Sequence, residues 1–131
     1  MKILCEMSFA ELLDKISILH LKSIALRGHK ELKEVLREKK ILEKILKGLR
    51  LNKKEVEKHL KSLIKDNKVS WRLLERISEK IENKNLDDEF RQLAYDAFRH
   101  NDMRYELKRD INNKFGSRIK EVKSYKKYLK K

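Results

Sequence analysis

The chain has 131 residues, of which 43% are charged and 40% are apolar, and it contains no proline and only three glycines. Folded domains most often contain about 100–150 residues, so we expect a single helical domain over residues 1–131. The scarcity of turn residues excludes a sandwich or barrel of many short strands. The apolar content excludes full disorder.

The chain is strongly basic, with 35 Lys and Arg residues against 21 Asp and Glu residues and a formal charge of +14. Such a positive field attracts nucleic acid, acidic membrane lipid or anionic metabolites. Lysine enrichment also arises in AT-rich genomes without any ligand. The charge alone therefore does not identify a partner.

Cysteine and histidine usage excludes several kinds of site. Cys5 is the single cysteine, so an intrachain disulfide cannot form, and the four histidines lack the spacing of a metal site and are expected at the surface or its edge. We expect neither a metal nor a cofactor. No apolar run approaches the roughly 20 residues of a membrane span, and the apolar segment at the N-terminus is too short for a signal peptide. A cytoplasmic protein without membrane insertion is expected.

The first half of the chain predicts a helical hairpin. Residues 2–7 look extended, and Ser8 and Glu11 have the spacing of a capping box, so a helix should run from Ser8 to about Arg27. Its apolar residues surround most of its circumference, which is typical of a central helix. A second helix, about Glu31–Leu49, should pack back against it as an antiparallel hairpin.

The second half predicts further helices and a tail. Asn52 should cap a short helix that ends near Asn67, and a separate segment should begin at Ser70 with Trp71 as a core anchor. A long helix, capped by Asp87 or Asp88, should reach about Lys114. A corner at Gly116-Ser117 leads into a basic tail, about residues 117–131. The prediction is an all-α, single-domain helical bundle with an antiparallel helical hairpin and a basic C-terminal tail.

The long helix carries polar residues where its apolar face should continue. Plotted at about 100° per residue, the face of Leu93 and Ala97 continues into Asn101, Arg104, Lys108 and Asn112. Burying these groups without partners would cost several kcal/mol. They either form an anion-binding pocket or join a buried network with acids of the first helix. The predicted ligand-binding residues are Asn101, Arg104, Lys108 and Asn112 with Asp14, Lys15 and Glu75, where Glu75 is a candidate second acid.

The basic tail is a second candidate surface. Lysines can neutralise phosphates while tyrosines stack on unpaired bases. The candidate nucleic-acid contacts are Lys120, Lys123, Tyr125, Lys126, Lys127 and Tyr128. Tyr125 and Tyr128 also have the helical spacing of side chains that dock onto the bundle, so this structural alternative stays open.

Three blocks carry a resemblance. They are SFAELLDKISILHLK from Ser8, then Trp71 with Glu75, and the residues NDMR, LKRDIN, GS and EVKSY between Asn101 and Tyr125. Together they resemble an uncharacterised family of short bacterial and viral helical proteins, a domain of unknown function. The family pattern has glycine, glutamate and tyrosine where this chain has Ala10, His20 and Phe98. The resemblance implies an association with surface-polysaccharide synthesis and no catalytic residue.

The sequence contains no Ser-His-Asp signature, phosphate loop or dinucleotide fingerprint, which disfavours hydrolase, kinase and dehydrogenase chemistry. We expect a non-catalytic accessory protein that binds an anionic small molecule or protein partner. One alternative is a nucleic-acid-binding protein that uses the basic tail. Another is a helical-bundle enzyme that acts on an acidic substrate through electrostatics, with an architecture like that of the helical chorismate mutases. The sequence also leaves open whether the protein forms a homo-oligomer.

Overall fold

The computed structural model describes residues 1–129. It contains α1 (Phe9–Ala25), α2 (Leu32–Gly48), α3 (Lys53–Glu82), α4 (Asp88–Lys114) and a short 3-10 helix, η1 (Lys126–Tyr128). Helices make up 73% of the structure, and residues 1–129 contain no strand. The predicted all-α bundle is therefore confirmed. The last two residues of the predicted tail lie outside the described part.

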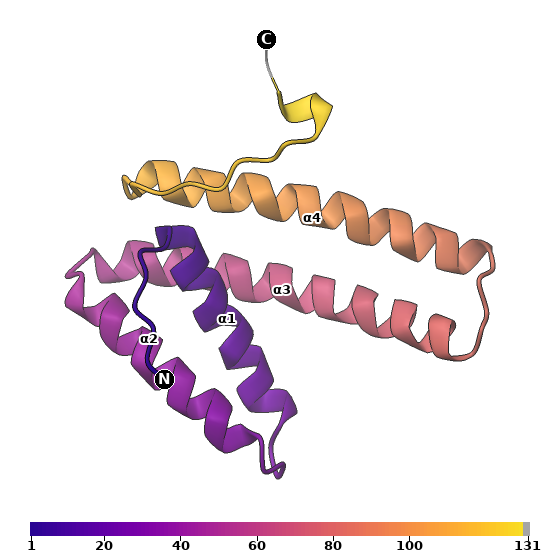
Figure 1. Cartoon of the computed structure of the whole chain (residues 1–131), viewed down its shortest axis with the longest axis horizontal. Helices are drawn as coiled ribbons and strands as arrows, with labels where there is room; N and C mark the ends of the chain where they lie inside the picture. Colours follow the sequence, from indigo (N-terminus) through magenta and orange to yellow (C-terminus); the bar gives the residue numbers. More distant parts are fainter. Residues whose placement is uncertain (130–131) are drawn as a thin grey trace.

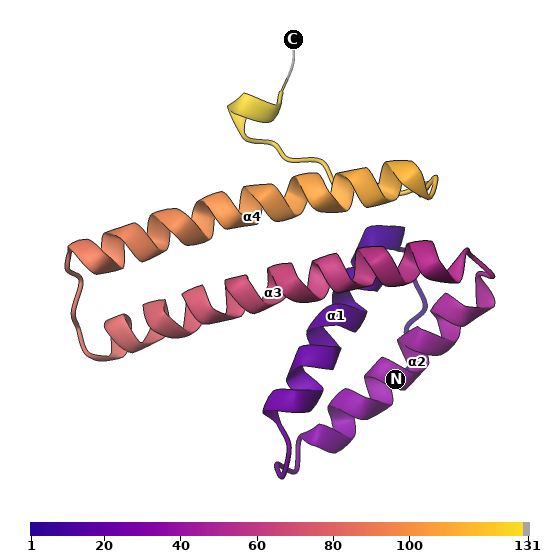
Figure 2. The same ribbon diagram turned by 180° about the vertical axis from the view of Figure 1, so that it is seen from behind.

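The helices form two hairpins of unequal length. Figures 1 and 2 show α1 and α2 against one half of the longer α3–α4 hairpin, whose other half extends beyond them. Helix α1 contacts the other three α-helices, whereas α2 contacts only α1 among the described helices. The prediction of a central first helix with an antiparallel second helix agrees with this arrangement.

Side chains cap three helices as the sequence predicts. The Ser8 hydroxyl accepts from the amide of Glu11 at 3.2 Å, and the Asn52 amide oxygen accepts from the amide of Glu55 at 3.1 Å. Asp87, rather than Asp88, caps α4 and accepts from the amide of Phe90 at 2.9 Å. This backbone hydrogen bond holds the pKa of Asp87 below its ordinary value.

Helix α3 is continuous over 30 residues, so the predicted break near Asn67 is wrong. Asn67 is only 6% exposed, and its side chain donates to Asp14 and Ser17 of α1. A polar residue with buried partners interrupts an apolar pattern without interrupting the helix. No glycine or proline stands between residues 53 and 82 to end it.

The hydrophobic core lies where α1 meets α3 and α4. Its buried side chains are Phe9, Ala10, Leu12, Leu13 and Ile16 of α1, Val56 and Leu63 of α3, and Ile111 of α4. Trp71, predicted as a core anchor, is only half-buried, and its indole N–H donates to Glu75 at 2.9 Å. The core therefore occupies one end of the α3–α4 hairpin.

Candidate functional site

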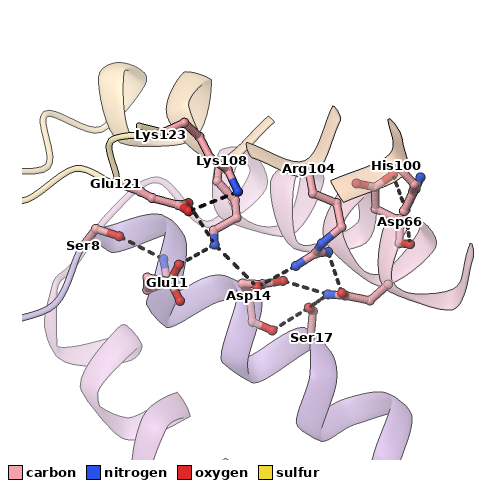
Figure 3. Close-up of polar contacts among 11 residues, drawn as sticks. Ser8, Glu11, Asp14, Ser17, Asp66, His100, Arg104, Lys108, Glu121 and Lys123 are labelled. Carbon is pink, nitrogen blue, oxygen red and sulfur yellow. Dashed lines mark hydrogen bonds and ion pairs between the residues drawn. The ribbon is translucent and has the colours of Figure 1, made fainter. Parts of the chain in front are cut away.

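Asp14 is the centre of a buried polar network between α1, α3 and α4 (Figure 3). Its carboxylate accepts from Arg104 Nη2 at 2.7 Å and from Asn67 Nδ2 at 2.8 Å. Arg104 Nη1 also donates to Asn67 Oδ1 at 2.5 Å, and Asn67 Nδ2 donates to Ser17 Oγ at 2.6 Å. The buried charges of Asp14 and Arg104 thus neutralise each other through direct hydrogen bonds.

Lys108 lies one helical turn beyond Arg104 and contacts three carboxylates. Its Nζ forms an ion pair with Glu11, lies 3.5 Å from Glu121 Oε2 and lies 3.9 Å from Asp14 Oδ2. The capping-box residue Glu11 therefore binds Lys108. The acids that balance Lys108 are Glu11 and Glu121, and the predicted acid Glu75 instead accepts from Trp71.

Asn112 and Ser117 hold the start of α1. The amide of Ala10 donates to Asn112 Oδ1 at 2.8 Å, and the amide of Phe9 donates to Ser117 Oγ at 3.0 Å. The first amides of a helix have no partner within the helix. Here Ser117, Asn112 and Ser8 accept from the amides of Phe9, Ala10 and Glu11. Because Asn112 is 1% exposed, water cannot replace it.

The structure brings together four of the seven predicted ligand-binding residues. Arg104, Lys108 and Asn112 of α4 converge on α1, where Asp14 lies. Lys15 is exposed and pairs with Glu38 of α2 at 2.7 Å. Glu75 is also exposed and lies at the rim of a groove between α1 and α3. These two residues lie outside the network.

Asn101 is exposed, so its predicted place on the buried face of α4 is wrong. The buried side of α4 instead includes His100, which is 9% exposed. Its Nε2 lies 2.9 Å from the carbonyl oxygen of Asp66. His100 was expected at the surface or its edge, and this expectation is also wrong. A shift of one residue turns a helical position by about 100°, which is enough to move Asn101 into solvent.

Three cations face three carboxylates in the network, because Lys123 Nζ also lies 3.9 Å from Glu121 Oε1. The Arg104 and Lys108 cations are paired with carboxylates that approach from α1 and the tail, and both side chains are only 12% exposed. An incoming anion would have to displace these carboxylates. The geometry therefore favours a structural role, in which the network joins α1 to α3 and α4.

The basic tail contacts α4 through its aromatic residues. The Tyr128 ring lies 5.2 Å from that of Tyr105, and the Tyr125 ring lies 6.1 Å from that of Phe98. Lys127 forms an ion pair with Asp102, which holds the pKa of that carboxyl below its ordinary value. These contacts leave Tyr128 half-buried, whereas Tyr125 stays 48% exposed.

The three other predicted tail lysines have different surroundings. Lys123 Nζ lies 5.7 Å from the ring centres of both Tyr105 and Tyr125. Lys120 donates to Asn113 Oδ1 at 2.8 Å, while Lys126 is exposed. Lys120, Lys123 and Lys127 therefore each contact a side chain of α4.

A basic surface that the sequence analysis missed runs along α3. Six exposed cations follow one another at steps of four and three residues, opposite the buried Val56 and Leu63, and we call them the α3 basic face: Lys54, Lys58, Lys61, Lys65, Lys68 and Arg72. At 1.5 Å per residue the α3 basic face is about 27 Å long. None of the six forms an ion pair within residues 1–129.

The outer side of α2 repeats the pattern with the exposed residues Lys33, Arg37, Lys40, Lys44 and Lys47. The acids of these two helices lie on their flanks. Glu38 pairs with Lys15, Glu43 with Lys39, and Glu55 with Lys114. The periodic cations are readable in the sequence, but the predicted break near Asn67 divided the α3 basic face into two unconnected segments.

Comparisons of the chain with models of known protein families, with curated proteins and with solved structures find no match. Within residues 1–129, no three His, Cys, Asp or Glu side chains gather in a way that could hold a metal ion. None of the helices in this part of the chain has the length and apolar character of a membrane span.

Proposed function

We propose that the protein is a non-catalytic binding protein that engages an anionic partner through the α3 basic face, and that this partner is the phosphate backbone of a nucleic acid. The observation that supports the proposal is a row of six exposed cations without an acidic partner in the described residues. This keeps the expected non-catalytic class and takes the partner, nucleic acid, from the first alternative. It moves the contact from the polar residues of α4 and the basic tail to α3.

The spacing of the α3 basic face suits a linear polyanion. Cations three or four residues apart rise by about 4.5–6 Å along a helix, so they present a regular row of charge to successive phosphates. Like charges at this spacing destabilise a helix by about 0.2–0.5 kcal/mol per pair. A bound phosphate backbone would relieve this repulsion and release its own counterions.

Two other anionic partners fit this surface less well. Behind the α3 basic face, Val56 and Leu63 are buried in the core, so this stretch of α3 has no free apolar side to insert into a lipid surface. Val69, at 40% exposure, is the one exposed large apolar side chain beside the row, whereas protein interfaces depend on clusters of such anchors. Contacts to phosphate alone carry no sequence information, so we expect binding without sequence preference.

Fluorescence anisotropy with single- and double-stranded oligonucleotides across a salt series tests the proposal. Six phosphate contacts predict that the logarithm of the affinity falls against log salt with a slope of about −4 to −5. The double variant Lys61→Gln/Lys65→Gln removes two central contacts. Its slope should be shallower by about 1.5.

The matched control is Lys120→Gln/Lys126→Gln, which removes the same charge from the tail. We expect it to bind nearly as well as the wild type. Equal losses in the two variants would show a response to net charge alone and contradict the proposed surface. A larger loss in the tail variant would favour the tail. Binding to anionic vesicles without binding to oligonucleotides would contradict the proposed partner.

A further inference from the structure

The half of the α3–α4 hairpin that extends beyond α1 and α2 has almost no core of its own. We call residues 71–100 the distal arm. Leu93, at 4% exposure, is the one buried hydrophobic side chain in this range, all of which the structure describes. Five large side chains of the distal arm are more than half exposed, namely Leu74, Ile81, Leu86, Tyr95 and Phe98. Helices gain most of their stability from packing an apolar face, so the distal arm lacks a partner.

Apolar side chains of the distal arm gather on one side of α3. The half-buried Trp71 and the exposed Leu74 and Ile81 lie at steps of three and seven residues, with Ser78 between the last two. Near Trp71 this face borders a groove of about 420 Å³, whose opposite wall consists of Ile18 and Leu21 of α1. Residues of both helices line the groove, and Figures 1 and 2 show α1 diverging from α3.

Charge distinguishes the distal arm from the rest of the chain. Residues 71–100 contain six basic and seven acidic residues, whereas the remainder contains 29 basic and 14 acidic residues. The distal arm therefore has a net charge of −1, and the remainder has a net charge of +15. Two copies of this protein repel each other over most of their surface, and this repulsion is weakest where distal arm meets distal arm.

The geometry points to a second copy of this chain as the occupant of the apolar face. The two distal arms pack against each other around a two-fold axis, so that Leu74 of each copy enters the groove of the other. The exposed apolar side chains of the distal arm, together with the α1 wall of the groove, form the centre of this interface.

The rims of the groove have complementary charges. Lys22 lies on the α1 rim and forms no ion pair within residues 1–129, while Glu75 lies on the α3 rim. In a two-fold interface each contact occurs twice, with the roles of the copies exchanged. The Lys22 of each copy therefore meets the Glu75 of the other copy at the edge of the apolar contact.

Sedimentation equilibrium of the full chain at physiological salt tests this interface. We expect a concentration-dependent dimer for the wild type and a monomer for Leu74→Glu, because the substitution places a carboxylate in the apolar contact. Leu74 is 60% exposed, so the variant should keep its helical circular dichroism. The matched control is Ile41→Glu on α2, which changes a 54% exposed side chain outside the interface and should leave the dimer intact.

Charge exchange tests the reciprocal contact. Lys22→Glu and Glu75→Lys should each weaken the dimer, and the double variant should restore it towards the wild-type affinity. A wild type that stays monomeric at high concentration would overturn the proposal and leave the apolar face to a different partner. A dimer that survives Leu74→Glu, or that Ile41→Glu dissolves, would overturn the proposed interface. Failure of the double variant to recover would overturn the two-fold arrangement.

Discussion

Asp14 joins three helices through the polar network. It belongs to α1, accepts from Arg104 of α4 and Asn67 of α3, and lies within 3.9 Å of Lys108. A buried ion pair contributes little relative to a well-packed apolar pair. The removal of one partner is costly because it leaves the other charge buried without compensation.

Arg104→Ala should therefore lower the free energy of unfolding by about 3–5 kcal/mol. Urea denaturation measures this loss of unfolding free energy. The double variant Asp14→Ala/Arg104→Ala should lose less than the sum of the losses of the two single variants. Lys15→Ala is the control, because its exposed ion pair is expected to contribute at most about 1 kcal/mol.

A different result would support the anion pocket. In that case Arg104→Ala would keep the stability of the wild type and lose a thermal-shift response to nucleotide sugars, polyphosphates or dicarboxylates.

His20 and His59 should make stability depend on pH near neutrality. Burial lowers the pKa of both imidazoles, and nearby lysines lower it further. The unfolded chain then binds protons at a higher pH than the folded chain does. Stability from these groups is therefore complete above the ordinary histidine pKa of about 6.5 and falls as the pH drops through it.

Chemical denaturation at pH values of about 8 and about 5.5 measures this effect on either side of the ordinary histidine pKa. Between these two pH values the double variant His20→Gln/His59→Gln should lose less stability than the wild type loses. An increase in wild-type stability on acidification would contradict the assigned direction of both pKa shifts.

At the scale of the helices, the start of α1 depends on the end of α4. Asn112→Ala should remove the acceptor of the Ala10 amide and leave that donor buried and unpaired, at a cost of about 1–3 kcal/mol. Hydrogen exchange should accelerate at Phe9 and Ala10 before it does in the rest of α1. Asn113→Ala is the matched control, because Asn113 is exposed and neighbours Asn112. Equal effects of the two substitutions would contradict the capping role.

At the scale of the whole molecule, the tail and α3 make separable predictions. Deletion of residues 126–131 removes four lysines and the Lys127–Asp102 ion pair. We expect the helical circular dichroism to remain. We also expect the salt dependence of oligonucleotide binding to change little, because the α3 basic face is intact. A slope shallower by about three to four would instead show that the deleted lysines contact phosphates.

Local sequence patterns were sufficient for the class of the fold and for part of the network. The helix caps at Ser8, Asn52 and Asp87 depend on side chains within three residues, so their spacing reveals them. The polar residues of α4 also predict buried partners, because Arg104 and Lys108 interrupt an apolar face. Asp14 was recognisable as one such partner since it stands among apolar residues of a central helix.

Only the tertiary structure decided which residues complete that network. Glu11 and Glu121 pair with Lys108, and Asn67 bridges Asp14 and Arg104. Asn112 accepts from the amide of Ala10, which lies 102 residues earlier in the chain. These contacts depend on where the helices cross and on how each is rotated about its axis. Helical periodicity describes one helix at a time and contains neither quantity, and an error of one residue turns a side chain by about 100°.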